Sequence, residues 1–162
     1  MRDPWVMKHP YENKFIMAYT ARASINNDPY QCGVIGMAES NDLYQWKSTK
    51  PLFGGFFSQL EVPQIFNVKN KWYCLFCNHP EYWYSKFKND YNGQNKRGTH
   101  YLIADKFEGP WELAPGPYLT TSSEIELYAG RVVNDQNGNF IGEISNPIPI
   151  NFDKNGLMSL EV

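Results

Sequence analysis

The chain has 162 residues, which is enough for one ordinary domain with a real hydrophobic core and too few to suggest a second one. Its formal net charge is -2, and its Lys and Arg residues are spread along the chain, so no basic patch indicates a nucleic-acid partner. No apolar run approaches the roughly 18 residues that cross a bilayer, and the N-terminus shows no charged and then apolar signal segment. We therefore expect neither nucleic acid nor a membrane as a partner, and the sequence assigns no cellular location.

The predicted secondary structure is almost entirely β. Aromatic residues make up 16% of the chain, which favours strands over helices, and helix-period stretches are nearly absent. Short apolar segments separated by Asn, Gly, Asp and Pro predict strands at 5–8, 15–21, 33–39, 64–68, 72–77, 99–104, 130–133, 140–143 and 147–151. Hairpin turns are expected at 12–14, 69–71 and 135–138, and the polar run 88–97 is expected to be an exposed loop.

The three cysteines, Cys32, Cys74 and Cys77, make an odd count that does not suggest a disulfide framework. Cys74 and Cys77 have a C-x-x-C spacing, but residues three apart on a strand point to opposite faces. We therefore expect buried strand cysteines rather than a metal or redox site.

A four-stranded unit occurs twice in the sequence. Asp-Pro-Trp-Val at 3–6 and Val-Pro-Gln-Ile at 62–65 begin the two copies, 59 residues apart (62 minus 3), and a third, weaker copy begins at 126. Repeats of four short strands are typical of propeller blades, and the repeat places three of them at roughly 1–50, 60–115 and 124–162, in a single partial domain. Because ordinary propellers have at least about four blades, we expect either a fragment or covered ends.

Motifs at the blade starts resemble a known group. Arg2-Asp3-Pro4 stands near the start of the first copy and Glu61-Val62-Pro63 near the start of the second, while Ser-Asn-Asp-Leu-Tyr-Gln-Trp at 40–46 and Gly-Pro-Trp at 109–111 follow in the outer parts. In these motifs the chain resembles the five-bladed β-propeller glycosidases of glycoside hydrolase family 32 and the related families 43 and 68. The resemblance covers essentially the whole chain, with the motifs in the correct order.

The resemblance implies roles for three of these residues. Asp3 matches the aspartate that stabilises the transition state, Arg2 its substrate-contacting neighbour, and Glu61 the general acid/base. Val62 stands where family 32 has Cys, which indicates a divergent relative. The family's nucleophilic aspartate lies on a blade before the Arg-Asp-Pro motif, so we expect the nucleophile to be absent from this chain.

The residues alone allow a plainer interpretation, in which Asp3 is a turn aspartate before proline and Glu61 an exposed strand-end carboxylate. Their placement at the starts of successive repeats favours the functional interpretation, because blade starts line the central channel of a propeller.

Other side chains are weaker candidates for substrate contacts. His79 and Tyr82 follow the second strand of the second copy, near the expected channel mouth, although an exposed loop would also explain them. Tyr128 and Arg131 begin the third copy and are expected at the channel. Trp46 and Trp111 occupy equivalent outer positions and are expected to pack within the blades.

The predicted function is a glycoside hydrolase acting on β-fructofuranosides such as sucrose or fructans, with a carbohydrate substrate and no requirement for a metal or organic cofactor. One alternative is a family 43-like enzyme acting on arabinose or xylose linkages. Another, of a different class, is a non-catalytic carbohydrate-binding propeller fragment. The sequence leaves the linkage, the stereochemistry and the oligomeric state open.

Overall fold

Two antiparallel sheets dominate the computed structural model of the chain, which describes residues 1–24, 28–84, 98–115, 128–133 and 148–160. No α-helix occurs in these ranges, which contain only two short 3-10 turns, η1 (Pro29–Gln31) and η2 (Pro80–Tyr82). None of the helices described is long and apolar enough to cross a membrane. The all-β fold class predicted from the sequence is confirmed.

The first sheet has the order β1-β2-β3-β4, with β5 also paired to β3. Along β1 the side chains alternate between exposed and half-buried, as expected of an edge strand with one face packed against the protein. Gly36 lies under the ring of Tyr19, and a Cβ at this position would lie 2.3 Å from that ring. The strands are β1 (Arg2–Lys8), β2 (Phe15–Arg22), β3 (Gly33–Ser40), β4 (Lys47–Ser48) and β5 (Phe53–Gly54).

The second sheet repeats this arrangement with the order β6-β7-β8-β9. Its first hairpin turns at Lys69 and Asn70, whose φ angles of 50° and 63° are those of a tight two-residue hairpin turn. The strands are β6 (Glu61–Val68), β7 (Lys71–Asn78), β8 (Gly98–Ala104) and β9 (Glu112–Leu113).

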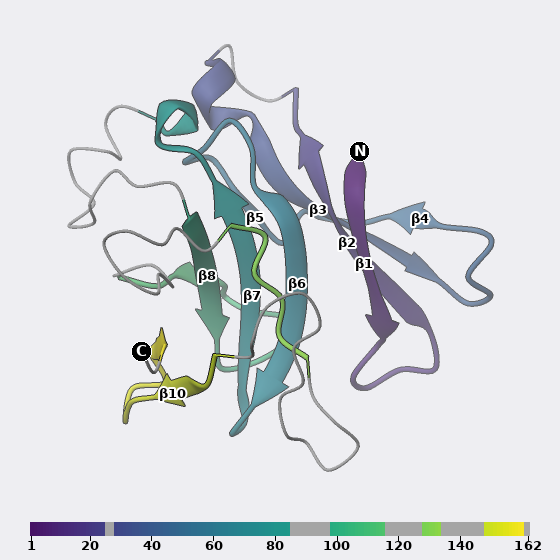
Figure 1. Ribbon diagram of the computed structural model, residues 1–162. Helices are drawn as coiled ribbons and strands as arrows, with labels where there is room; N and C mark the ends of the chain where they lie inside the picture. Colours follow the sequence, from purple (N-terminus) through teal and green to yellow (C-terminus); the bar gives the residue numbers. More distant parts are fainter. Residues whose placement is uncertain (25–27, 85–97, 116–127, 134–147, 161–162) are drawn as a thin grey trace.

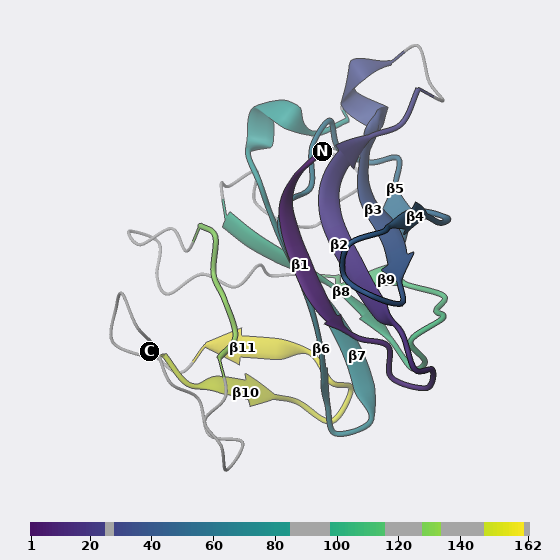
Figure 2. The same cartoon turned by 90° about the vertical axis from the view of Figure 1, so that its right-hand side faces the viewer.

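The main core lies between these two sheets. Residues of β2 and β3 that face the second sheet, such as Ile16 and Ile35, pack with Phe57, Cys74 and Phe76, all of them 2% exposed or less. This packing sets β1 and β6 side by side and running in the same direction (Figures 1 and 2). The two strands therefore begin at the same end of the molecule.

A C-terminal hairpin covers the opposite face of the second sheet. It consists of β10 (Ile150–Phe152) and β11 (Met158–Leu160), labelled in Figure 2. It packs against Tyr73 and Tyr101. The hydroxyl of Tyr73 donates to the carbonyl of Gly156 at 2.9 Å, and the amide of Met158 donates to the hydroxyl of Tyr101 at 2.9 Å.

Most of the predicted strands are present, with ends one to three residues further out. One prediction is wrong: residues 130–133 form no strand, although they run alongside β6. The predicted strand 140–143, the turn 135–138 and the loop 88–97 lie outside the described residues, and the last predicted strand begins at Ile150. The division into three blades stays a prediction.

Candidate functional site

The backbone turns sharply where β1 and β6 begin. Asp3 and Val62 both have positive φ angles, 55° and 53°, and each is followed by proline. At both places the strand shifts register against its partner, between Arg2 and Trp5 and between Glu61 and Gln64. Such bulges re-aim side chains and occur next to active sites, and a positive φ at a β-branched residue such as Val62 is uncommon and strained.

These two bulges bring the predicted catalytic carboxylates into one cluster. The guanidinium of Arg2 contacts both, with Nε 3.2 Å from Asp3 Oδ2 and a terminal nitrogen that donates to Glu61 Oε1. The same nitrogen donates to the side-chain oxygen of Gln59. The side chains of Asp3 and Glu61 are 28% and 18% exposed, and that of Arg2 is 50% exposed, so the cluster is open to a ligand.

Tyr128 connects the cluster to the third sequence repeat. Its hydroxyl donates to Glu61 Oε2, so both oxygens of this carboxylate are engaged. The ring of Tyr128 lies edge-on to that of His79, with centroids 5.3 Å apart, and His79 in turn contacts Tyr82 at 5.8 Å. Three of the predicted site residues, Tyr128, His79 and Tyr82, therefore line up on one side of Glu61.

Arg131 lies next to this cluster but is held by structural contacts. Its guanidinium donates to the carbonyl of Pro63 at 2.9 Å and lies 5.6 Å from the ring centre of Trp5. Burial lowers the pKa of Arg131, although the side chain remains charged at neutral pH. A hollow of ≈ 440 Å³ adjoins these two residues and is also lined by Gln64, Phe66, Val132 and Val133.

Two buried side chains near the cluster were not predicted from the sequence. Thr20 donates its hydroxyl to Asp3 Oδ2 at 2.9 Å and accepts the amide of Val62 at 3.2 Å. Cys77 accepts the amide of Ala129 at 2.8 Å, and burial raises the pKa of its thiol. The only sequence signal for them is their position on the second strand of each copy, opposite Arg2 and Glu61.

Cys74 and Cys77 are buried on β7, as predicted. Cys74 belongs to the core between the sheets, whereas Cys77 faces the segment 128–133, and all three thiols are free. Among the described residues, no group of three or more His, Cys, Asp and Glu side chains could hold a metal ion.

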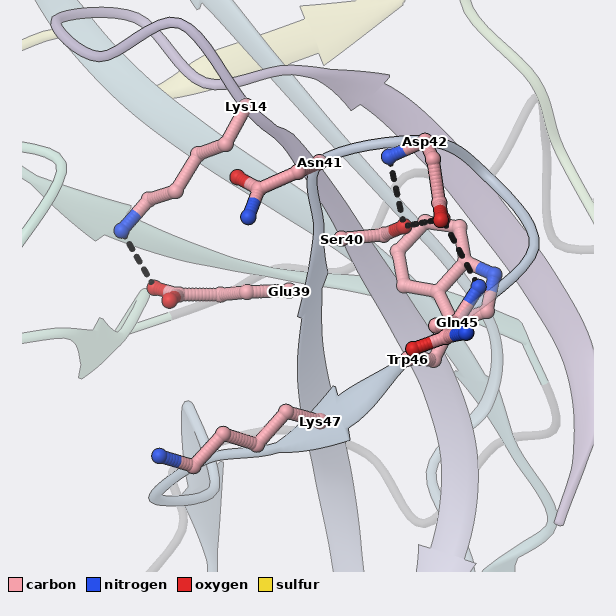
Figure 3. A pocket seen from close by; sticks show the side chains of 8 residues that line it. All are labelled: Lys14, Glu39, Ser40, Asn41, Asp42, Gln45, Trp46 and Lys47. Carbon is pink, nitrogen blue, oxygen red and sulfur yellow. Dashed lines mark hydrogen bonds and ion pairs between the residues drawn. The ribbon is translucent and has the colours of Figure 1, made fainter.

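A second hollow, of ≈ 340 Å³, lies near the other end of β1, at the turn between β3 and β4 (Figure 3). Lys14 is paired with Glu39 at 3.0 Å, and Asp42 accepts the amides of Gln45 and Tyr44 at 2.8 and 2.9 Å, which lowers the pKa of Asp42. In Figure 3 Lys14 and Glu39 therefore hold each other, and Asp42 holds the turn. We place the candidate site at Asp3 and Glu61 instead.

The repeated sheets define an all-β, propeller-type fold, with a cluster of carboxylates where β1 and β6 begin. The chain is similar to inulosucrase from Halalkalicoccus jeotgali bound to kestose, with 23% identity and a TM-score of 0.62 over 75% of this chain and 32% of that one. It is also similar to beta-fructofuranosidase from Microbacterium saccharophilum K-1, with 14% identity and a TM-score of 0.57 over 77% and 28% of the two chains. Levansucrase from Gluconacetobacter diazotrophicus gives 15% identity and a TM-score of 0.56 over 84% and 33%.

These likenesses confirm the predicted propeller-type fold and the resemblance to fructosidases at the level of the fold. The chain spans about a third of the length of the solved proteins that it matches. Neither a protein-family profile nor a curated protein sequence matches it.

Proposed function

We propose that this chain carries part of the active site of a glycoside hydrolase that acts on β-fructofuranosides such as sucrose or fructans. The observation that carries the proposal is the meeting of Asp3 and Glu61. They are distant in sequence, begin the inner strands of two adjacent sheets at strained bulges, and share one guanidinium. A fructose-containing substrate is supported by the names of the solved proteins with this fold, inulosucrase and beta-fructofuranosidase, and by the kestose bound to the inulosucrase.

The two carboxyl groups fit the two tasks of glycosidic cleavage. An acid must protonate the leaving oxygen, and a charged carboxylate stabilises the oxocarbenium-like transition state. Glu61 is the less exposed of the two and matches the general acid/base of the families that the chain resembles, so we assign it the acid role. Asp3, held by Thr20 and Arg2, takes the stabilising role.

The neighbouring side chains supply groups that suit a sugar. Arg2 is half-exposed, so its remaining N–H groups can donate to sugar hydroxyls. Tyr128, His79 and Tyr82 offer aromatic edges and polar tips on the other side of Glu61. Arg131 supports the cluster through Pro63 and does not need to contact the substrate.

A second candidate function, non-catalytic sugar binding, is favoured by one specific observation. In the described ranges, no third carboxylate forms a hydrogen bond or ion pair with Arg2, Asp3 or Glu61. A retaining mechanism needs a nucleophile about 5–5.5 Å from the acid, and Asp3 is assigned a different task. Binding without cleavage would need only the groups already present.

The test is sugar release from sucrose, inulin and an aryl arabinofuranoside by the purified chain, with sugar binding followed by saturation-transfer NMR. We expect binding of the fructosides, and we expect both Glu61→Gln and Asp3→Asn to abolish any release. Glu39→Gln, which changes a carboxylate at the far hollow, is the matched control and should leave both readouts unchanged. Binding without release would favour the non-catalytic function, and release only from the arabinofuranoside would replace the fructoside assignment. If the folded chain neither binds these sugars nor releases sugar from them, the proposal is overturned.

A further inference from the structure

Thr20 and Cys77 occupy equivalent places in the two sheets. Thr20 lies opposite Arg2 in the β1–β2 pair, and Cys77 lies opposite Glu61 in the β6–β7 pair. Both side chains are buried, with 3% and 1% exposure. A threonine and a cysteine are similar in size, and each carries an atom that can accept a hydrogen bond.

Each of the two side chains accepts a backbone amide from the segment that follows its own sheet. Thr20 accepts the amide of Val62 at 3.2 Å, and Cys77 accepts the amide of Ala129 at 2.8 Å. Val62 and Ala129 both have left-handed backbones, with φ angles of 53° and 58°. The same contact therefore recurs at two successive junctions.

The recurring contact fixes the residue just before each left-handed position. Glu61 precedes Val62, and Tyr128 precedes Ala129. A left-handed conformation is sterically disfavoured for a non-glycine residue, so it persists only where neighbouring contacts enforce it. Loss of the accepting atom would let the backbone relax and turn the preceding side chain away from the cluster.

Thr20 has an additional contact that Cys77 lacks. Its hydroxyl donates to Asp3 Oδ2 at 2.9 Å while its oxygen accepts the amide of Val62. One side chain thus connects the carboxylate of the first sheet to the backbone that carries the carboxylate of the second. A hydroxyl can make both bonds at once, whereas an aliphatic side chain of the same shape can make neither.

We propose that Thr20 and Cys77 are positioning residues of the candidate sugar site: Thr20 fixes Asp3 and Glu61 relative to each other, and Cys77 fixes Tyr128 against Glu61. Their significance for sugar binding rests on the proposed function. Their effect on the backbone and on the side chains of the cluster is independent of the proposed function. It can be measured without a sugar.

The first measurement is amide hydrogen exchange by NMR on the folded chain. Thr20→Val should make the Val62 amide exchange at least ten-fold faster, and Cys77→Ala should do the same for the Ala129 amide. Thr20→Ser and Cys77→Ser, which keep an accepting oxygen, should restore protection. Cys74→Ala is the matched control, because it removes another buried thiol of β7 that accepts no amide from the next segment.

The second measurement is the affinity for kestose of the same variants. We expect Thr20→Val and Cys77→Ala to weaken binding at least five-fold and the serine variants to remain within two-fold of the parent chain. Thr20→Cys separates the two roles of Thr20, since a thiol accepts the Val62 amide but donates only weakly to Asp3. It should protect the amide and still weaken binding, and it serves in place of Thr20→Val if that variant does not fold.

The outcomes separate the two proposals. If the parent chain binds no kestose, the proposed function fails, and the exchange rates together with the NMR shifts of the Glu61 and Tyr128 side chains still decide the positioning role. Parent-like exchange at Val62 and Ala129 in folded Thr20→Val and Cys77→Ala would overturn that role. An equal effect of Cys74→Ala on the Ala129 amide would overturn it for Cys77.

Discussion

Left-handed residues at the starts of β1, β6 and the segment 128–133 determine where the side chains of the cluster point. Asp3, Val62 and Ala129 carry positive φ angles within a few degrees of one another, although their side chains differ. Only the backbone conformation is common to the three positions. We infer that the strain at these positions is maintained because it directs Arg2, Glu61 and Tyr128 toward one cluster.

Replacing Val62 by glycine tests this strain. Glycine adopts a positive φ without steric cost, so relief of strain should offset much of the lost side-chain packing. The control is Val68→Gly, a change on the same strand at a residue that is also half-buried. Both changes should lower the free energy of unfolding, and we expect the loss to be about 1 kcal/mol smaller for Val62→Gly. Urea unfolding measures both, and equal losses would contradict strain at Val62.

Arg2 should matter for binding more than for stability. Its head is half-exposed, and exposed ion pairs contribute about 0–1 kcal/mol. We expect Arg2→Gln to change the free energy of unfolding by less than about 1 kcal/mol while it reduces the affinity for kestose at least ten-fold. Urea unfolding and NMR titration provide the two readouts. A large loss of stability with unchanged affinity would make Arg2 a structural residue.

At the scale of the elements, the inner strands are joined by side chains that bond to the backbone of the next strand. The indole of Trp5 on β1 donates to the carbonyl of Ile65 at 3.1 Å. Gln64, at the equivalent place on β6, donates to the carbonyl of Val132 at 2.6 Å and accepts its amide at 2.8 Å. The segment 128–133 therefore continues the arrangement of inner strands although it forms no strand itself.

Gln64→Leu should loosen this junction. Gln64 is 2% exposed, so the change would leave the amide and carbonyl of Val132 without their buried partner, at a cost of about 1–3 kcal/mol. Gln64→Glu keeps an acceptor for the amide and should protect it better than leucine does. Exchange of the Val132 amide, measured with urea unfolding, checks both expectations. Unchanged exchange in Gln64→Leu would show that other contacts hold the segment.

The outer parts of the two sheets differ in a way that the repeat did not predict. Trp46 and Trp111 make the same bond, from the indole N–H to the carbonyl of Leu43 at 3.0 Å and of Phe107 at 2.9 Å. Only Trp111 also packs against the core between the sheets, because the first sheet lies over it. Packing within the blade therefore describes Trp111 well, whereas Trp46 is held mainly by its own turn.

At the scale of the whole molecule, a histidine is buried in the core between the sheets. His100 is 1% exposed and lies among the rings of Phe57, Phe76 and Trp83, at centroid distances of 5.3 to 6.0 Å. Burial lowers the pKa of His100 from 6.5 to about 3. The folded protein therefore holds this imidazole in its neutral form.

This burial predicts a loss of stability in acid. As the pH falls from about 6.5 to about 3, the unfolded chain binds a proton at His100 that the folded chain does not, so the free energy of unfolding falls by up to about 1.4 kcal/mol per pH unit. His100→Phe removes this contribution. We expect the loss of stability between pH 7 and pH 5, measured by urea unfolding, to be about 2 kcal/mol smaller in the variant. Equal losses would show that His100 does not titrate in this range.

The sequence by itself determined the strand order and the pairing of hairpins. Alternating apolar residues and turn residues such as Lys69-Asn70 act over a few positions, so their effect can be read locally. The repeat of 59 residues then placed Asp3 and Glu61 at the starts of neighbouring inner strands, because repeated units stack in order. The blade starts in the sequence thus indicated the neighbourhood of the candidate site.

Only the tertiary structure decided the contacts within that neighbourhood. The bonds from Thr20 to Asp3 and Val62 and from Tyr128 to Glu61 join residues of different strands or segments, 17 to 67 positions apart. No glycine marks the left-handed turns of Asp3 and Val62 in the sequence, and the contacts of the buried Thr20 hold them instead. Packing of one sheet against the next determines these contacts and turns. The residue pattern along a single strand does not predict such packing.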